Sequence, residues 1–294
     1  MPVPSPVGVR FIAATLRAYR FGGGDPTTRI GAGVFARATL TPHGPGTLWL
    51  DWRDGSVDAQ AWGPGADWLM DGVGALTGAA DPGHRFEDAH PVVLQAQRNH
   101  PDVRFGASRL LYHELLPVIL GQRITAGEAV RQWRHLVHRL GQPAPGPLQL
   151  RLPPEPELLA GRPAWWFHPM GIEAKRAEAL RTVARHAGRL AEWSELPDAG
   201  ARLRLLPGIG QWTVGSVLAL SHGDPDAVAV GDYHLKNVVV HAFTGRPRGT
   251  DEEMLHLLAP YAGQRGRVVR LLELDGHRAP AFGPRQRVLP TNRW

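Results

Sequence analysis

The sequence predicts an α+β protein, with an antiparallel β-rich domain over residues 1–80, an all-helical domain over 81–276 and a basic, proline-containing tail over 277–294. Up to about residue 78, short segments of alternating or β-branched and aromatic residues are separated by turn-forming clusters, which is typical of antiparallel strands. From about residue 81, apolar residues recur at spacings of three and four, as they do on one face of a helix. A chain of 294 residues with 43% hydrophobic residues can bury a sizeable core.

The β-rich domain is expected to contain three strands connected by short turns. Glycine and proline gather between the strands, and turns of this kind join neighbouring strands of an antiparallel meander. The turn clusters lie at 22–26, 41–46 and 54–55, and the expected strands are 34–40, 47–52 and 57–62.

Two helix starts carry a capping box, in which a threonine side chain and a glutamate three residues later satisfy the first free amides. These are Thr125 with Glu128 and Thr250 with Glu253. A proline-rich loop over 142–156 separates two groups of helices. The expected helices are 90–100, 107–120, 125–140, 175–189, 199–206, 211–221, 232–243 and 250–273, the last interrupted at Pro260.

The charge is positive and is carried almost wholly by arginine. The net charge is +6 with histidine neutral, the pI is near 10.4, and Lys175 and Lys236 are the only lysines. This balance suits an anionic partner, nucleic acid first. A compositional bias of the source genome explains it equally well, so charge alone does not decide.

The absence of cysteine excludes several classes of site. Disulfides, thiolate zinc sites, cysteine nucleophiles and cysteine-bound iron–sulfur clusters are all ruled out. His113-Glu114 opens a zinc-protease pattern, but Pro117 stands where the second histidine is needed. The N-terminus is a poor secretory signal and no run of about 18 apolar residues occurs, so we expect a cytoplasmic protein with no membrane partner.

The most informative stretch is the turn LPGIGQWT over residues 206–213. Its two glycines permit positive φ and lack side chains, so successive backbone N–H groups can point outward together. With the first amides of the following helix they form a site for a phosphate oxygen, while Ile209 would anchor the turn in the core. Such a hairpin binds a nucleic-acid backbone without reading sequence, and a purely structural helical hairpin is the alternative. The residues predicted to bind the DNA backbone are Leu206, Pro207, Gly208, Ile209, Gly210 and Thr213.

A second informative stretch places an aspartate at the start of a predicted helix. Asp232 lies 22 residues after Gly210, between a short apolar segment and an amphipathic helix. Aspartate at such a position is most often an N-cap. Capping and catalysis are compatible, because helix-start amides would hold the carboxylate rigid and ionised.

Together these stretches resemble the helix–hairpin–helix DNA glycosylase superfamily, and more narrowly its 3-methyladenine DNA glycosylase II branch. Two upstream segments agree: ILGQRIT at 119–125 resembles the family's loop into its next helix, and GIEAKRAEAL at 171–180 resembles its Lys-Arg-Ala helix. The resemblance covers about residues 81–275. It implies a glycosylase domain of two helical lobes with the active-site cleft between them, behind an N-terminal β domain.

The resemblance implies that Asp232 is the catalytic carboxylate of a base-excision-repair enzyme. The partner would be double-stranded DNA containing a damaged base, which is flipped out of the helix before its glycosidic bond breaks. A fixed carboxylate would stabilise the positive charge that builds on the deoxyribose and orient or deprotonate the attacking water. An alkylated purine already carries positive charge and needs no strong general acid. We expect a monomer, associated with the nucleoid.

Position 212 separates the subclasses of this family. The bifunctional glycosylase/lyase members carry a lysine nucleophile after the hairpin, whereas Trp212 cannot form a Schiff base. Lys236, one helical turn beyond Asp232, is expected to contact phosphate or nearby acids. The prediction is therefore a monofunctional hydrolase that leaves an abasic site, and the missing cysteines exclude the cluster-bearing endonuclease III type.

The base pocket departs from the family pattern. Ser216 stands where the best-known branch member has an aromatic residue, and no tryptophan lies between Arg267 and Gly276, so the pocket is expected to be wider or differently stacked. Arg123 follows Gln122 where the family often places an apolar wedge that fills the gap left by the flipped base. The candidates for pocket wall or wedge are Trp212, Tyr112, Trp166, Gln122, Arg123 and Ser216.

The same resemblance implies no cofactor other than a structural Na⁺ or K⁺. The carbonyls of Arg204, Leu206 and Ile209 would hold this cation between the hairpin and a phosphate. Two alternatives stay open: a helix–hairpin–helix DNA-binding protein without catalysis, and a glycosylase for deaminated or other lesions.

Overall fold

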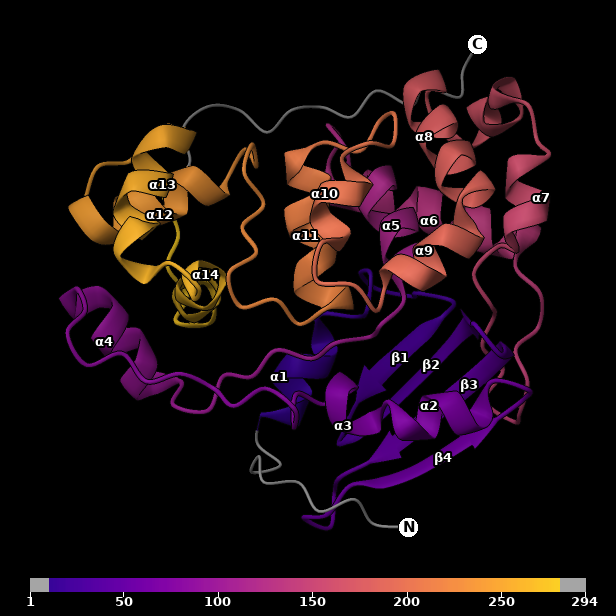
Figure 1. The fold of residues 1–294 in the computed structure, drawn as a ribbon, viewed down its shortest axis with the longest axis horizontal. Helices are drawn as coiled ribbons and strands as arrows, with labels where there is room; N and C mark the ends of the chain where they lie inside the picture. The colour runs from indigo at the N-terminus through magenta and orange to yellow at the C-terminus, as the bar shows by residue number, and fades with distance from the viewer. Residues whose placement is uncertain (1–10, 281–294) are drawn as a thin grey trace.

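The computed structural model describes residues 11–280. An antiparallel sheet forms one end of the molecule, a helical lobe stands on it, and a second group of helices lies beside that lobe (Figure 1). The predicted α+β class is confirmed. Most of the basic tail (281–294) and the first ten residues lie outside the described range. No helix within 11–280 is both long and apolar enough to cross a bilayer.

The sheet is a meander with strand order β1-β2-β3-β4, in which every neighbouring pair is antiparallel. The three expected strands are present, and a further strand, β1, precedes them. The sequence reading missed β1 because only Ile30 of its four residues is large and apolar. The bounds are β1 (Thr28–Gly31), β2 (Val34–Thr41), β3 (Gly44–Asp51) and β4 (Asp58–Trp62).

Both faces of the sheet are covered. Alternation along β2 sends Phe35 toward one face and Ala36 toward the other. Three short helices cover the Phe35 side, and Leu150 and Leu152 of the proline-rich loop cover the Ala36 side. The sequence predicts none of these helices, since they are too short to show a helical period: α1 (Ile12–Arg17), α2 (Ala66–Asp71) and α3 (Val73–Leu76).

Helices α5 to α11 form the lobe that stands on the sheet, called here the central lobe. Its core is built around Trp133, which is fully buried. Arg176 of the Lys-Arg-Ala helix is also buried, and its guanidinium donates to the Leu120 carbonyl and to Gln132. The elements are α5 (Leu111–Leu120), α6 (Ala126–Leu140), α7 (Pro156–Ala160), η1 (Ala164–Met170), α8 (Ala174–Arg185), α9 (Ala187–Trp193), α10 (Ala199–Leu203) and α11 (Gln211–Ser221).

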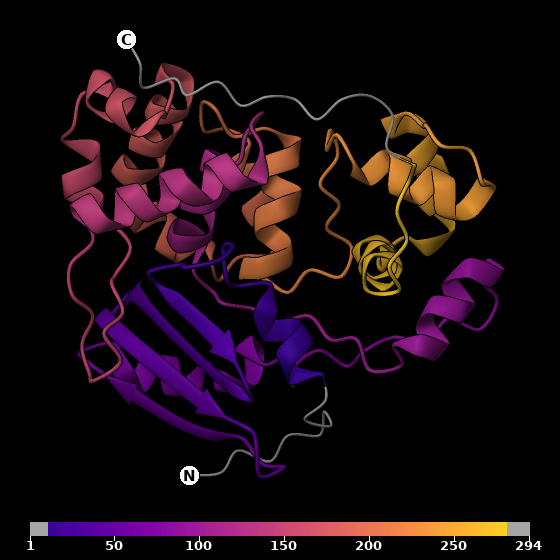
Figure 2. The same ribbon diagram turned by 180° about the vertical axis from the view of Figure 1, so that it is seen from behind.

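The remaining helices form a second lobe, called the C-terminal lobe. It includes α4, which precedes the central lobe in the chain but packs against α14 (Figures 1 and 2). Val93 of α4 shares a buried core with Val239, Leu258 and Val268. The elements are α4 (Pro91–Asn99), α12 (Leu235–Thr244), α13 (Asp251–Leu258), η2 (Ala259–Tyr261) and α14 (Arg265–Leu274).

Several helix limits differ from the expected ones. The helix expected from residue 107 begins at Leu111, and the one expected over 175–189 is divided at His186. The helix expected from Asp232 begins at Leu235 and its N-cap residue is His234, so Asp232 caps it from two residues before the N-cap, by accepting from both of their backbone amides. The break predicted at Pro260 is present, as the short η2 turn between α13 and α14.

The connections between the two lobes pass side by side through one narrow junction. The backbone amides of Ser108 and Arg109 donate to the carbonyls of Leu220 and Ser221, at 2.9 and 2.8 Å. A Cβ added at Gly223 would lie 3.2 Å from the Gly106 carbonyl oxygen, so the two segments are in close contact. Both links between the lobes, residues 104–110 and 222–230, therefore meet at this junction.

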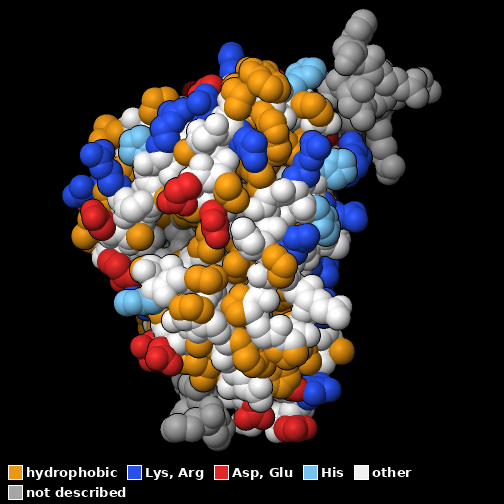
Figure 3. All heavy atoms as spheres, turned by 90° about the vertical axis from the view of Figure 1, so that its right-hand side faces the viewer, with side chains coloured by type: hydrophobic (Ala, Val, Ile, Leu, Met, Phe, Trp, Pro, Cys, Tyr) orange, Lys and Arg blue, Asp and Glu red, His pale blue; other side chains and the backbone are white. Residues whose placement is uncertain are grey.

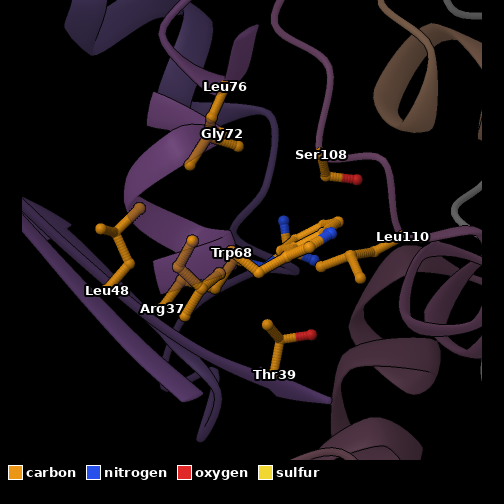
Figure 4. Close-up of a pocket in the computed structure, with 9 residues that line it drawn as sticks. Arg37, Thr39, Leu48, Trp68, Gly72, Leu76, Ser108 and Leu110 are labelled. Carbon is orange, nitrogen blue, oxygen red and sulfur yellow. The ribbon is translucent and has the colours of Figure 1, made fainter. Parts of the chain in front are cut away.

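A buried polar cluster joins the sheet to the central lobe. Arg37 of β2 pairs with Glu114 of α5 at 2.8 Å, and both side chains are at most 4% exposed. His113 is hydrogen-bonded to Thr39 at 2.9 Å. The His113-Glu114 dipeptide is thus a structural contact between sheet and helix. Arg37 also lines a cavity of about 20 Å³ under α2, with Trp68 and Ser108 (Figure 4), which is large enough for one water molecule and no larger ligand.

Candidate functional site

The predicted hairpin is formed between α10 and α11. Leu206 and Ile209 are buried at 6% and 4% exposure and anchor the turn, as the sequence predicts for Ile209. Pro207, Gly208 and Gly210 between and after them are exposed. Gly208 has φ +87°, a conformation that side-chain-bearing residues rarely adopt. The turn therefore presents backbone to solvent over an apolar anchor.

The loop before α6 braces this hairpin. The Gln122 side-chain amide donates to the Gly208 carbonyl and to the Thr213 hydroxyl, each at 3.0 Å. Thr213 is 2% exposed, so its hydroxyl faces this brace. The next residue, Arg123, is exposed and has φ +58°, a strained conformation for a residue with a side chain. The Gln122 side chain thus contacts the hairpin, whereas the neighbouring Arg123 side chain is exposed to solvent.

Asp232 lies where the C-terminal lobe meets α11, and three donors hold its carboxylate. One oxygen accepts from the backbone amides of His234 and Leu235 at 2.8 and 2.9 Å, which is the expected cap of the following helix. The other accepts from the indole nitrogen of Trp212 at 3.1 Å. These bonds fix the position of the carboxylate.

A second acid supports the loop that carries Asp232. The Gly231 amide donates to Asp251 at 3.0 Å, and the other oxygen of Asp251 pairs with Lys236 at 3.3 Å. The sequence analysis did not identify Asp251 as part of the site. In the sequence, Asp251 is marked only by following the helix-capping residue Thr250. Its contact with Gly231 joins residues 20 positions apart and leaves no local pattern.

A cavity of about 260 Å³ opens next to the loop that carries Asp232, although neither Asp232 nor Trp212 lines it. The segment that leads into Asp232 lines it, and the Asp232 amide donates to the Ala229 carbonyl of that wall at 3.1 Å. Helices α1, α11 and α14 supply the other walls. The side chains that line the cavity include Tyr19, Ser216, Val228, Ala229, Arg270 and Glu273.

Glu273 is the acidic residue of this lining and was not predicted from the sequence. Its carboxylate lies 3.8 Å from the guanidinium of Arg270, which in turn donates to the Ala14 carbonyl at 3.1 Å. Crowding by the surrounding protein raises the pKa of Glu273, and the charge of Asp232 adds to this rise. The two carboxylates are therefore close enough to repel each other.

The pocket candidates are placed differently from one another. Ser216 lines the cavity, and Trp212 holds the Asp232 carboxylate. Tyr112 and Trp166 pack on the core of the central lobe instead. The Tyr112 hydroxyl donates to the Pro154 carbonyl, and Arg139 and Arg162 lie over the Trp166 ring. Neither is part of the lining that the described residues give the cavity.

No group of three or more acidic or histidine side chains within residues 11–280 converges as a metal site. Two large apolar side chains near the site are exposed: Leu205 before the hairpin at 79% and Tyr233 after Asp232 at 68%. Trp212, in the first turn of the helix that follows the hairpin, links the hairpin to the Asp232 carboxylate.

The fold is similar to the helix–hairpin–helix fold of DNA glycosylases of known structure. The 3-methyladenine DNA-glycosylase from Archaeoglobus fulgidus gives a TM-score of 0.73 at 16% identity, over 94% of this chain and 98% of that one. The Clostridium acetobutylicum 8-oxoguanine glycosylase/lyase, in complex with double-stranded DNA containing cytosine opposite 8-oxoguanine, gives 0.63 at 12% identity, over 87% and 89%. MBOgg1 in complex with a low-affinity DNA ligand gives 0.63 at 16%, over 86% and 89%. No protein-family model matches the sequence, and no curated protein matches it either.

Proposed function

We propose that the protein is a monofunctional DNA glycosylase of base excision repair that removes alkylated purines. The observation that carries the proposal is the Asp232 carboxylate, held by three donors at the end of a segment that lines a cavity of about 260 Å³. A protein that only binds DNA has no need of a carboxylate fixed at such a place. The fold shared with solved glycosylases supports the same assignment.

DNA is proposed to dock on the exposed hairpin. The amides around Gly208 and Gly210 and those of the first turn of α11 would meet a phosphate, with the positive end of the helix dipole behind them. Arg123, exposed beside the hairpin, would enter the duplex and replace the extruded nucleotide, stacking its guanidinium on the neighbouring bases.

The proposed reaction is hydrolysis of the bond between C1′ and the base nitrogen. As this bond breaks, its electron pair returns to a cationic base, which leaves neutral, and positive charge develops on the sugar. Asp232 stabilises that charge, and water adds to C1′ while its proton passes to the carboxylate or to solvent. An abasic sugar and a free base are the products.

The residues beside Asp232 support hydrolysis without a lyase step. Trp212 uses its indole nitrogen to hold the carboxylate and has no amine to form a Schiff base. Lys236 pairs with Asp251, so its amine serves the loop that positions Asp232.

A monovalent cation at the hairpin is compatible with this docking. The carbonyls of Arg204, Leu206 and Ile209 would hold it, and carbonyl oxygens are suitable ligands for a hard cation. The Leu206 carbonyl accepts the Ile209 amide at 3.1 Å and keeps a second lone pair. When bound, the ion would add positive charge toward a phosphate.

Duplexes that each carry one defined lesion test the proposal. We expect release of an alkylated purine and strand cleavage only after alkali treatment. Absence of excision on every lesion would show a DNA-binding protein without catalysis. Excision confined to deaminated or oxidised bases would change the substrate class, and strand breaks before alkali would contradict the monofunctional mechanism.

A further inference from the structure

The cavity next to the loop that carries Asp232 has few surfaces on which a base can stack. An arginine guanidinium already lies over each of its two aromatic rings. The distance to the ring centre is 5.0 Å for Arg37 over Tyr19 and 5.0 Å for Arg267 over Phe105. Much of the remaining wall is glycine, alanine, valine and leucine. Recognition of a base therefore depends on the polar groups of this cavity more than on an aromatic sandwich.

Two charged side chains of α14, Arg270 and Glu273, line the cavity, and they differ in whether they already make a hydrogen bond. Arg270 donates to the Ala14 carbonyl of α1, which ties α14 to the sheet domain. Glu273 lies one helical turn further on, and its side chain is 47% exposed because the cavity opens to solvent. Its nearest cation, Arg270, is 3.8 Å away, beyond hydrogen-bonding distance. Glu273 therefore has acceptor capacity left for a ligand.

Resting on the proposed function, we infer that Glu273 is a specificity-determining residue that accepts hydrogen bonds from the N–H edge of the extruded base and selects bases that carry a positive charge. Glu273 lines the cavity from α14, and Asp232, in the loop before α12, is close enough to repel it, so a cation beside Glu273 is favoured over a neutral guest. Burial and the charge of Asp232 raise the pKa of Glu273, and a cation bound beside the carboxylate would lower it again. Arg270 and Arg278 oppose this rise without removing it.

The test is single-turnover excision of 7-methylguanine, a cationic purine, from a duplex. Glu273→Gln keeps the shape of the side chain and removes its charge, and we expect the rate to fall about tenfold, as for loss of a charge-assisted hydrogen bond. Glu273→Asp keeps the charge and should recover most of the rate. Glu192→Gln, an exposed glutamate of α9, is the matched control and should match the wild type.

Binding to a duplex with an abasic site separates recognition from structure, because such DNA places no base in the cavity. We expect Glu273→Gln to leave this affinity unchanged. An unchanged rate on 7-methylguanine, an equal loss of abasic-site affinity, or an equal loss of rate on the neutral purine hypoxanthine would each overturn the inference. If the wild type itself excises no base, the proposed function fails, and the role of Glu273 falls with it.

Discussion

At the scale of single residues, the site depends on how side chains are held. Asp232 caps its helix and also accepts from Trp212, so one carboxylate has both a structural and a proposed chemical role. His113 differs from Asp232: histidine is often catalytic, but His113 is buried and makes structural hydrogen bonds between the sheet and α5. Its ring lies among threonine hydroxyls between the sheet and α5.

Replacement of Asp232 by asparagine should separate catalysis from binding. The asparagine side chain retains an oxygen that can cap the helix, but it cannot stabilise positive charge on the sugar. We expect the single-turnover rate of Asp232→Asn to fall about 100-fold or more, with affinity for lesion-containing DNA largely kept. Retained turnover would mean that another carboxylate serves the reaction.

His113 makes the stability of the fold depend on pH. Burial lowers the pKa of His113 well below its usual value, and the charge of Arg37 lowers it further, so the folded protein keeps the ring neutral. In the unfolded chain the ring binds a proton below a pH of about 6.5, which favours unfolding as the pH falls. We expect the free energy of unfolding, measured with denaturant between pH 8 and pH 5, to decrease below this value. His113→Gln should reduce that slope, whereas the same change at exposed His256 should leave it intact.

At the scale of elements, short segments orient backbone groups that no side chain could supply. The hairpin is held from inside by Leu206 and Ile209 and from one side by Gln122. The loop before α12 is held in the same way by Asp251 of α13. Each functional turn is thus fixed by a neighbouring element.

The two hairpin glycines should respond differently to alanine. A Cβ at Gly208 would lie 2.8 Å from the Ala179 side chain, at a φ of +87°, so Gly208→Ala should cost about 1–3 kcal/mol of stability and weaken DNA binding. At Gly210 no atom lies within 4 Å, and its φ of −95° suits alanine. Gly210→Ala should therefore keep the melting temperature and still lower affinity, because the new methyl group meets the phosphate. Unchanged affinity in Gly210→Ala would argue against docking on this turn.

Asp251 is expected to be a positioning residue. Asp251→Ala frees the Gly231 amide, lets the loop move and should lower the single-turnover rate about tenfold through misplacement of Asp232. Affinity for an abasic duplex should not change, since the hairpin is untouched. Glu252→Ala, in the same first turn of α13, is the control. Equal losses in both variants would assign the effect to helix stability instead.

At the scale of the whole molecule, the net charge of +6 favours the approach of an anionic partner. On the face drawn in Figure 3, Lys and Arg side chains lie mostly over the helical half, and fewer lie over the sheet. The arginines are not all free for DNA, since Arg37, Arg176 and Arg267 are buried and bonded within the fold.

Binding of duplex DNA should weaken steeply with salt. Each phosphate contact releases counterions, so the logarithm of the association constant should fall by about 0.9 per contact for each tenfold rise in salt. Fluorescence anisotropy with a labelled abasic duplex across a salt series measures this slope. A slope near zero would contradict docking through the backbone.

What the sequence could predict was local. The hairpin turn, the cap at Asp232 and the Thr250–Glu253 capping box each involve neighbours in the chain, and the structure contains them. The packing of α4 in the C-terminal lobe could not be predicted from the sequence, because its partner α14 lies far along the chain. For the same reason neither the Asp251 contact with Gly231 nor the position of Glu273 on the cavity left a pattern in the sequence.

The junction between the lobes has a mechanical consequence. One link between the lobes is held to the end of α11, where the amides of Ser108 and Arg109 donate to residues 220 and 221, and Arg270 ties α14 to α1 as well. A change in the angle between the lobes would strain these hydrogen bonds and the ion pair of Arg267 with Asp81. These ties favour one relative orientation of the two lobes, and with it one spacing between Glu273 of the C-terminal lobe and Trp212 of the central lobe.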